Sequence, residues 1–180
     1  MLFRSAQVCG VLGEDVFSTD GAALEAVVGA ALRRAGYRIA IAESCTGGLI
    51  LSRLTDVPGS SDYVKQGVVV YSNEAKTSLL GVPPELLDAP GAVSEPVATA
   101  MASGIRARAG VDVGVGVTGI AGPGGGSEAK PVGTVAIAAS TPVGDRVRTF
   151  RFHGEREQIK FQASQAALDM VRRMLMHGQK

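Results

Sequence analysis

The sequence has little of what a metal centre or a disulfide framework requires. Its 180 residues include two cysteines, two histidines and no tryptophan. Neither Cys9 nor Cys45 stands at a zinc-ligand spacing from another Cys or His, so we expect no metal site and no cofactor. Two thiols do not make a disulfide framework either, which favours a reducing compartment.

Long apolar runs and an excess of one charge are also missing. No segment approaches the roughly 20 apolar residues that cross a bilayer, and residues 1–10 lack the apolar core of a signal peptide. The 18 basic and 17 acidic residues leave a formal net charge of +1, so no long-range field draws in phosphate backbones or anionic lipid. We therefore expect a cytoplasmic protein that has neither nucleic acid nor a membrane as its partner.

The sequence does contain enough apolar residues for one folded domain. Hydrophobic residues make up 46% and charged residues 19%, which places the chain outside the disordered class. The first residues show no clear period, so we expect an N-terminal arm or connector over residues 1–18 and a single domain over residues 19–180. The sequence leaves a homo-oligomer open.

Helix and strand patterns alternate along the chain. Helical spacing over 24–32, with Thr19 or Asp20 as the cap, precedes an apolar strand at 37–42. The same reasoning predicts further helices at 49–54, 74–80, 95–109 and 155–176, and strands at 67–71, 111–117, 132–139 and 146–152. We interpret 67–71 as a core strand and the half-polar 146–152 as an outer strand. The order, with a β-hairpin near the end, predicts an α/β fold, a three-layer α/β/α sandwich around a mixed β-sheet.

Three turns that follow strands are dense in hydroxyls, glycines or cations, at 43–48, 71–76 and 118–126. In open α/β sheets ligands bind beyond the carboxyl ends of the strands, so these turns are candidate site segments. The last one follows a nominal GxGxxG pattern. Its glycines, Gly114 and Gly116 among them, lie inside a strand pattern with no helix after it, so a dinucleotide site is not indicated.

Ser44 lies where a strand ends and a helix begins, so its hydroxyl can project into a cleft. The N–H groups of Thr46, Gly47 and Gly48 would point the same way and could hold an oxyanion. Simple helix capping by Ser44 or Thr46 is the competing explanation. Cys45 is a rival nucleophile, although a free cysteine is more often a small buried apolar group.

A nucleophilic serine needs a base, and with so few histidines a lysine or a tyrosine is the remaining candidate. Lys76 fits if Asn73 caps the following helix, because the positive end of the helix dipole then lowers the pKa of the ammonium. Tyr71 could relay a proton or orient the base. A solvated surface lysine and a core tyrosine are the alternatives.

The glycine-rich segment 118–126 offers backbone N–H groups that can approach an anion closely, with Thr118 as a hydroxyl donor. A phosphate or a carboxamide could bind there, and a mobile loop is the alternative.

Four motifs occur in order along the chain: AESCTGG at 42–48, YSNEAK at 71–76, GAVSEP at 91–96 and TGIAGPGGGSEAKPVGTV at 118–135. Together they resemble the CinA C-terminal domain family, from about residue 12 to the last helix. The resemblance implies an α/β/α fold, no metal, and a nicotinamide-nucleotide amidase. Such an enzyme hydrolyses the carboxamide of nicotinamide mononucleotide to nicotinate mononucleotide and ammonia in pyridine nucleotide salvage.

Carried over residue by residue, the resemblance makes Ser44 the nucleophile, with Lys76 and Tyr71 as its activating partners. It implies a small-molecule nucleotide as substrate, which Arg156 would bind through the phosphate. The family's Gly-Asp-Arg reads Gly-Glu-Arg here. The other residues expected to bind substrate are Thr46, Gly47, Thr118, Gly119, Ala121 and Gly122.

Two further expectations follow from the resemblance. Many family members carry an N-terminal domain with a nucleotide pyrophosphatase activity, which nothing in this sequence matches, so we expect that activity to be absent. The competing function is a non-catalytic nucleotide-binding or competence-associated regulatory module. The intact Ser44, Tyr71 and Lys76 speak against it.

Overall fold

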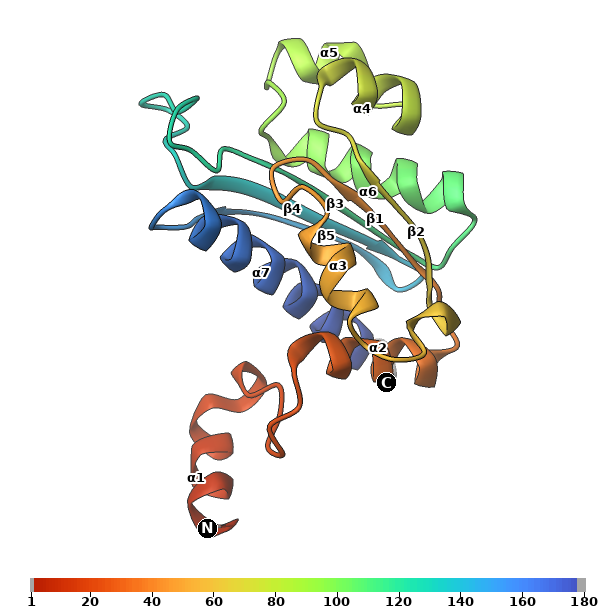
Figure 1. Ribbon diagram of the computed structural model, residues 1–180, viewed down its shortest axis with the longest axis vertical. Helices are drawn as coiled ribbons and strands as arrows, with labels where there is room; N and C mark the ends of the chain where they lie inside the picture. Colours follow the sequence, from red (N-terminus) through yellow and green to blue (C-terminus); the bar gives the residue numbers. More distant parts are fainter. Residues whose placement is uncertain (1, 178–180) are drawn as a thin grey trace.

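The computed structural model describes residues 2–177, whose middle layer is a five-stranded sheet in the order β2-β1-β3-β4-β5 (Figure 1). The strands are β1 (Ile39–Glu43), β2 (Val64–Val69), β3 (Val113–Gly119), β4 (Thr134–Thr141) and β5 (Gly144–Arg151). β2, β1 and β3 run parallel, whereas β4 and β5 form an antiparallel hairpin that pairs with β3. The predicted mixed sheet is therefore confirmed.

Helices cover both faces of the sheet (Figure 1). One face carries α2 (Leu24–Ala35), α3 (Leu49–Thr55) and α7 (Arg156–His177), and the other carries α4 (Asn73–Leu80), α5 (Pro84–Asp88) and α6 (Glu95–Ala109). Two short 3-10 turns, η1 (Gly13–Asp15) and η2 (Ser60–Asp62), complete the connections. The three-layer α/β/α sandwich is confirmed.

β1 shows why the two layers of helices form. Its residues alternate between the two cores, with Ile39 and Ile41 packed on the side of α7 and Ala40 and Ala42 on the side of α6. All four are fully buried, as expected of a central parallel strand that is covered on both faces. The small alanines face α6 and the large isoleucines face the core that α7 closes.

Close packing of α6 on β3 depends on two glycines. A Cβ added to Gly114 would lie 2.2 Å from the carbonyl oxygen of Ala102, and one added to Gly116 would lie 2.3 Å from that of Ala98. These glycines therefore let a helix backbone approach a strand. Their role in packing agrees with the rejection of a dinucleotide motif.

Two expectations from the sequence are wrong in detail. The apolar run at 67–71 is not a core strand, because β2 spans Val64–Val69 and lies at the edge of the sheet, where its side chains are half-buried or exposed. The cap of α2 is Ala23 rather than Thr19 or Asp20. The Asp20 carboxylate instead accepts hydrogen bonds from nearby groups of its own turn, before the helix begins.

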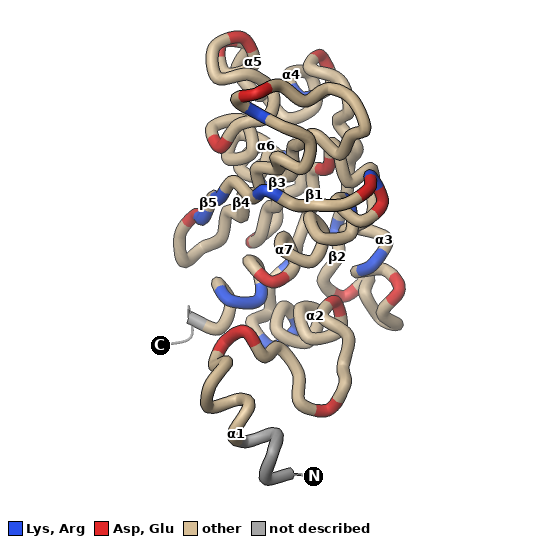
Figure 2. Tube along the Cα trace, turned by 90° about the vertical axis from the view of Figure 1, so that its left-hand side faces the viewer, with Lys and Arg blue, Asp and Glu red and all other residues tan. Residues whose placement is uncertain are grey.

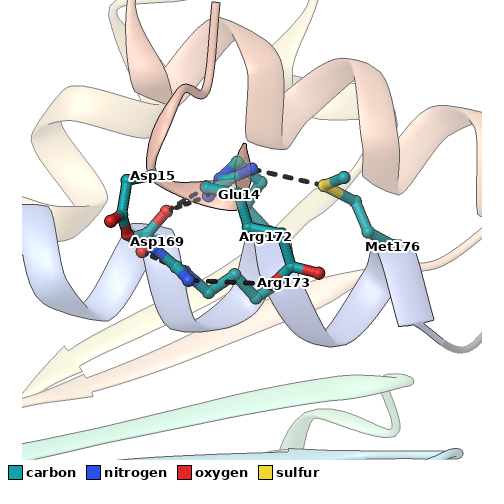
Figure 3. Close-up of polar contacts among 6 residues, drawn as sticks. All are labelled: Glu14, Asp15, Asp169, Arg172, Arg173 and Met176. Carbon is teal, nitrogen blue, oxygen red and sulfur yellow. Dashed lines mark hydrogen bonds and ion pairs between the residues drawn. The ribbon is translucent and has the colours of Figure 1, made fainter. Parts of the chain in front are cut away.

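The segment before α2 projects from the body as α1 (Leu2–Leu12) (Figure 1). Two arginines of α7 bind residues 14 and 15, which connect α1 to the rest of the chain (Figure 3). Arg172 is 2% exposed and donates to the carbonyl oxygen of Glu14, while Arg173 forms a 2.7 Å ion pair with Asp15. Asp169 accepts from both arginines and so ties the cluster together.

Charges of both signs are interspersed along the chain (Figure 2). Among the described residues no helix has the length and the apolar character that a membrane crossing needs.

Candidate functional site

The carboxyl ends of the parallel strands β1, β2 and β3 meet at one edge of the sheet, where a pocket of about 220 Å³ opens. It is lined by Ser44, Cys45, Tyr71, Asn73, Lys76, Ala92, Val93, Thr118, Gly119, Ala121 and Arg156. The fold therefore brings together seven of the ten residues predicted to react with the substrate or bind it, and these seven come from four separate segments. Thr46, Gly47 and Gly122 are not in the lining.

Ser44 is the first residue after β1 and is 8% exposed. Its N–H donates to the carbonyl oxygen of Val117 on β3 at 2.9 Å, so the end of the neighbouring strand holds its backbone. Gly47 and Gly48 then adopt left-handed φ values of 64° and 95°, which side chains with a Cβ rarely adopt. The two glycines explain how the chain can turn so sharply from the strand into α3.

The amides of this turn are less free than the sequence predicts. Gly47 N–H donates to the carbonyl oxygen of Ser44 at 3.1 Å, and Gly48 N–H donates to the carboxylate of Glu43 at 3.0 Å. Neither is available to an oxyanion, so that expectation is wrong for both glycines. Within residues 2–177, Thr46 has no hydrogen-bond partner for its N–H or for its buried hydroxyl. Thr46 therefore keeps donors in this turn that no group of the described chain occupies.

Lys76 is buried, with 2% of the residue exposed, on the second turn of α4. Ser72, not Asn73, is the N-cap of this helix, since its side chain accepts from Ala75 N–H at 3.1 Å. Burial lowers the pKa of the Lys76 ammonium, so desolvation, rather than the helix dipole invoked from the sequence, is the main cause. The Nζ atom donates two long hydrogen bonds, both at 3.4 Å, to the carbonyl oxygens of Tyr71 and Ser72.

Cys45 also lines the pocket but is a poor nucleophile. Only 6% of the residue is exposed, and burial raises the pKa of its thiol to about 12. The thiolate is the reactive form of cysteine, and it is scarcely populated at neutral pH with such a pKa. The geometry therefore favours Ser44 over its neighbour.

Arg156, the first residue of α7, bridges two of the site segments. Its Nη2 donates to the hydroxyl of Tyr71 at 3.2 Å, and its Nη1 donates to the carbonyl oxygen of Gly122 at 2.7 Å. A guanidinium has five N–H donors, so these two contacts leave others for an anion. Tyr71 itself is 65% exposed and stands at the mouth of the pocket.

Thr118 lines the pocket, but its hydroxyl is already engaged. Its hydroxyl donates to the carbonyl oxygen of Ala92 at 2.8 Å, so its proton is not free for a ligand in this structure. This bond ties the end of β3 to the GAVSEP segment, and the Lys130 ammonium ties the glycine-rich loop to the carbonyl oxygen of Pro90. The third and fourth sequence motifs thus support one wall of the pocket together.

Sequence reasoning missed two polar residues at the site. Asn73, treated only as a helix cap, lines the pocket. The Lys160 amine lies 3.7 Å from the position that a Cβ on Gly47 would take. Lys160 follows Arg156 by four residues on α7, and that helical spacing is the signal that could have revealed it.

The donor set offers little to a metal ion. Within residues 2–177 no group of three or more His, Cys, Asp or Glu side chains could hold one.

The fold and the pocket define an α/β/α protein whose site combines a serine and a buried lysine at the carboxyl edge of a mixed sheet. The chain belongs to the CinA C-terminal domain family, whose model matches residues 21–175.

Curated relatives agree with this membership. A CinA-like protein from Desulfotalea psychrophila is 53% identical over 165 residues, which are 92% of this chain and 40% of the relative. A putative competence-damage inducible protein from Moorella thermoacetica is 54% identical over 164 residues, or 91% of this chain and 40% of the relative. The chain thus spans about 40% of the length of these relatives.

Solved structures agree as well. A competence-damaged protein (CinA) superfamily protein from Klebsiella pneumoniae matches with a TM-score of 0.82 and 36% identity, over 86% of this chain and 96% of that one. The competence/damage inducible protein CihA from Agrobacterium tumefaciens matches with a TM-score of 0.81 and 40% identity, over 87% and 96% of the two chains.

Proposed function

We propose that this chain is a nicotinamide-nucleotide amidase, which hydrolyses the carboxamide of nicotinamide mononucleotide to nicotinate mononucleotide and ammonia. The observation that carries the proposal is the presence of Ser44 and a buried Lys76 in one pocket. Burial lowers the pKa of the Lys76 ammonium, which increases the fraction of the free amine that a general base needs. The family membership supports the same reaction.

In the first step the Ser44 hydroxyl attacks the carboxamide carbon while the Lys76 amine takes its proton. The carbonyl oxygen of the substrate becomes an oxyanion, for which the candidate donors are the N–H groups of Cys45, which lines the pocket, and of its neighbour Thr46, since neither has an acceptor oxygen in the described chain. The tetrahedral intermediate then collapses, the C–N bond breaks, and the proton on Lys76 goes to the departing ammonia. An ester between Ser44 and the nicotinate remains.

In the second step water attacks this ester, and Lys76 again accepts a proton and returns it to Ser44. The net reaction consumes one amide and one water and yields one carboxylic acid and one ammonia. Tyr71, whose hydroxyl is held by Arg156, is the second activating group at the mouth of the pocket.

The phosphate of the substrate is assigned to Arg156 and to the loop that contains Gly122. The pocket of about 220 Å³ is smaller than the roughly 300 to 1,000 Å³ typical of sites that enclose a whole ligand. We therefore assign the enclosed space to the nicotinamide ring of the substrate, with Thr118, Gly119 and Ala121 along one side. The ribose phosphate would extend to the exposed guanidinium at the start of α7.

The test is ammonia release from nicotinamide mononucleotide by the purified chain, with nicotinate mononucleotide quantified in parallel. One acid per ammonia, with a chelator present, is the expected result. No turnover of this substrate, together with tight binding of it, would support the nucleotide-binding regulatory module instead.

A further inference from the structure

Glu43 ends β1 directly before Ser44, yet no step of the proposed reaction uses it. The residue is 1% exposed. One carboxylate oxygen accepts from the N–H groups of Gly48 and Ile50 at 3.0 and 3.2 Å, and the other accepts from Leu51 N–H at 2.9 Å. A buried carboxylate therefore takes up the backbone donors at the start of α3.

These bonds close a ring around the nucleophile. Glu43 and Gly48 stand on either side of residues 44–47, so a bond between them fixes both ends of the turn that carries Ser44. The two glycines of the turn have no side chains with which to hold their left-handed conformations. The carboxylate thus supplies the restraint that the turn itself lacks.

We propose that Glu43 is a positioning residue for Ser44, which it serves by fixing the 44–48 turn and by occupying the first amides of α3. Because those amides are occupied, the substrate oxyanion is directed to the turn amides that have no acceptor oxygen in the described chain, Cys45 and Thr46. This role rests on the proposed amidase function, since it concerns the geometry of that reaction.

Glu43→Gln is the most informative change, because it keeps the size of the side chain. An amide has one acceptor oxygen and an NH2 group, so at least one backbone N–H would face another donor. A shift of the serine by a fraction of an ångström affects the reacting geometry more than the binding of the nucleotide. We expect kcat to fall roughly tenfold to a hundredfold while KM changes by less than about threefold.

Glu25→Gln is the matched control. Glu25 is a half-buried carboxylate on α2 that also bonds to α3, through a 2.7 Å ion pair with Arg53, which follows the turn by five residues. Its loss should lower stability and leave kcat within about twofold of the wild-type value. Glu43→Asp, which keeps both oxygens on a shorter stem, should recover part of the kcat lost in Glu43→Gln.

A wild-type kcat in Glu43→Gln would overturn the positioning role, as would equal losses of kcat in Glu43→Gln and Glu25→Gln. If Glu43→Gln does not fold, Glu43→Asp decides the matter. Its kcat must then fall below that of Glu25→Gln at the same fraction folded, and an equal kcat counts against the role.

Amide hydrogen exchange, measured by NMR, separates this inference from the proposed function because it needs no substrate. The N–H groups of Gly48, Ile50 and Leu51 should be protected in the wild type and exchange faster in Glu43→Gln. A wild type that releases no ammonia defeats the amidase proposal. Unchanged exchange in the variant defeats the positioning role, whatever the activity.

Discussion

The Ser44 pocket encloses about 220 Å³, whereas a groove between β5 and α7 encloses about 440 Å³. The groove is lined by Asp15, Arg146, Val147, Arg148, Phe150, Ala166, Asp169, Met170 and Arg173. Its two acids are already paired with Arg173, and the Arg148 guanidinium stacks 4.9 Å from the ring centroid of Phe150. The larger hollow is thus a charged, solvent-facing surface.

The smaller hollow differs in how its polar groups are held. Lys76 and Thr118 are almost fully buried, and Ser44 is nearly so. Burial changes the chemistry of a group by removing water from it, as the lowered pKa of Lys76 illustrates. The groove arginines of β5, Arg146 and Arg148, stay exposed to water. The desolvation of reactive groups, and not the volume of a cavity, therefore marks the candidate site.

Among substitutions in the two regions, Ser44→Ala in the pocket should cause the largest loss of activity. Loss of the hydroxyl removes the covalent step, so we expect turnover of nicotinamide mononucleotide to fall by more than about 10³-fold. The melting temperature should hardly change, since a small polar side chain contributes little packing. Cys45→Ala is the control and should keep most of the activity. An inactive cysteine variant beside an active serine variant would reverse the nucleophile assignment.

Lys76→Met should lower kcat by about 10²- to 10⁴-fold because it removes the proposed general base. In the wild type the pKa of Lys76 lies below its ordinary value of 10.5, so the unfolded chain binds more protons between the two pKa values. The free energy of unfolding should therefore rise with pH through that window. Lys76→Met should flatten this rise and increase stability at pH 7, as pH-dependent denaturation can check. A steeper rise in the variant would contradict a buried, destabilised ammonium.

Arg156→Ala should lower kcat/KM for nicotinamide mononucleotide roughly tenfold to a hundredfold, the effect expected from one charge-assisted bond to phosphate. Because the guanidinium also holds the hydroxyl of Tyr71, the riboside without phosphate should lose activity too, but less. Rates on both substrates for both proteins form a cycle that isolates the phosphate contribution. Equal losses on the two substrates would mean that Arg156 acts only by holding Tyr71. Lys160 would then be the next cation to test for phosphate binding.

Arg172→Leu tests the region beside the groove. Arg172 is buried and bonds to Asp169 and to the carbonyl oxygen of Glu14, so its loss removes two hydrogen bonds at the base of the N-terminal arm. We expect the free energy of unfolding to fall by about 1 to 3 kcal/mol, measured by urea denaturation, with kcat unchanged. A large loss of kcat would show that the base of the N-terminal arm influences the pocket.

The smallest effect is expected from the double change Arg146→Ser with Arg148→Ser. Both side chains are exposed on the outer strand, so stability should change by no more than about 0.5 kcal/mol and kcat/KM by less than about twofold. Steady-state kinetics and a thermal melt suffice. A strong fall in activity would mean that the larger groove takes part in function and that the contrast between the two regions is wrong.

Much of this protein could be predicted from local patterns. The order of strands and helices and the outer position of β5 follow from the periodicity of apolar residues. Helices α2 and α4 end at glycines in the left-handed conformation, Gly36 and Gly81, because of backbone preferences that act within a few residues. The motifs that contain Ser44, Tyr71 and Lys76 could also be predicted from the sequence, because each motif is a short continuous segment.

Only the tertiary structure decided which of these local features act together. The order of strands puts β2 at the edge although residues 67–71 are an apolar run, because an apolar run does not specify how many neighbours a strand has. The desolvation of Lys76 arises from the packing of α4 and its neighbours, and the occupation of Gly48 N–H arises from Glu43, a residue the sequence offered only as the end of a strand. Hydrogen bonding and burial depend on groups brought together by folding, so the sequence determined the parts of the site and the fold determined which donors and amines remain free.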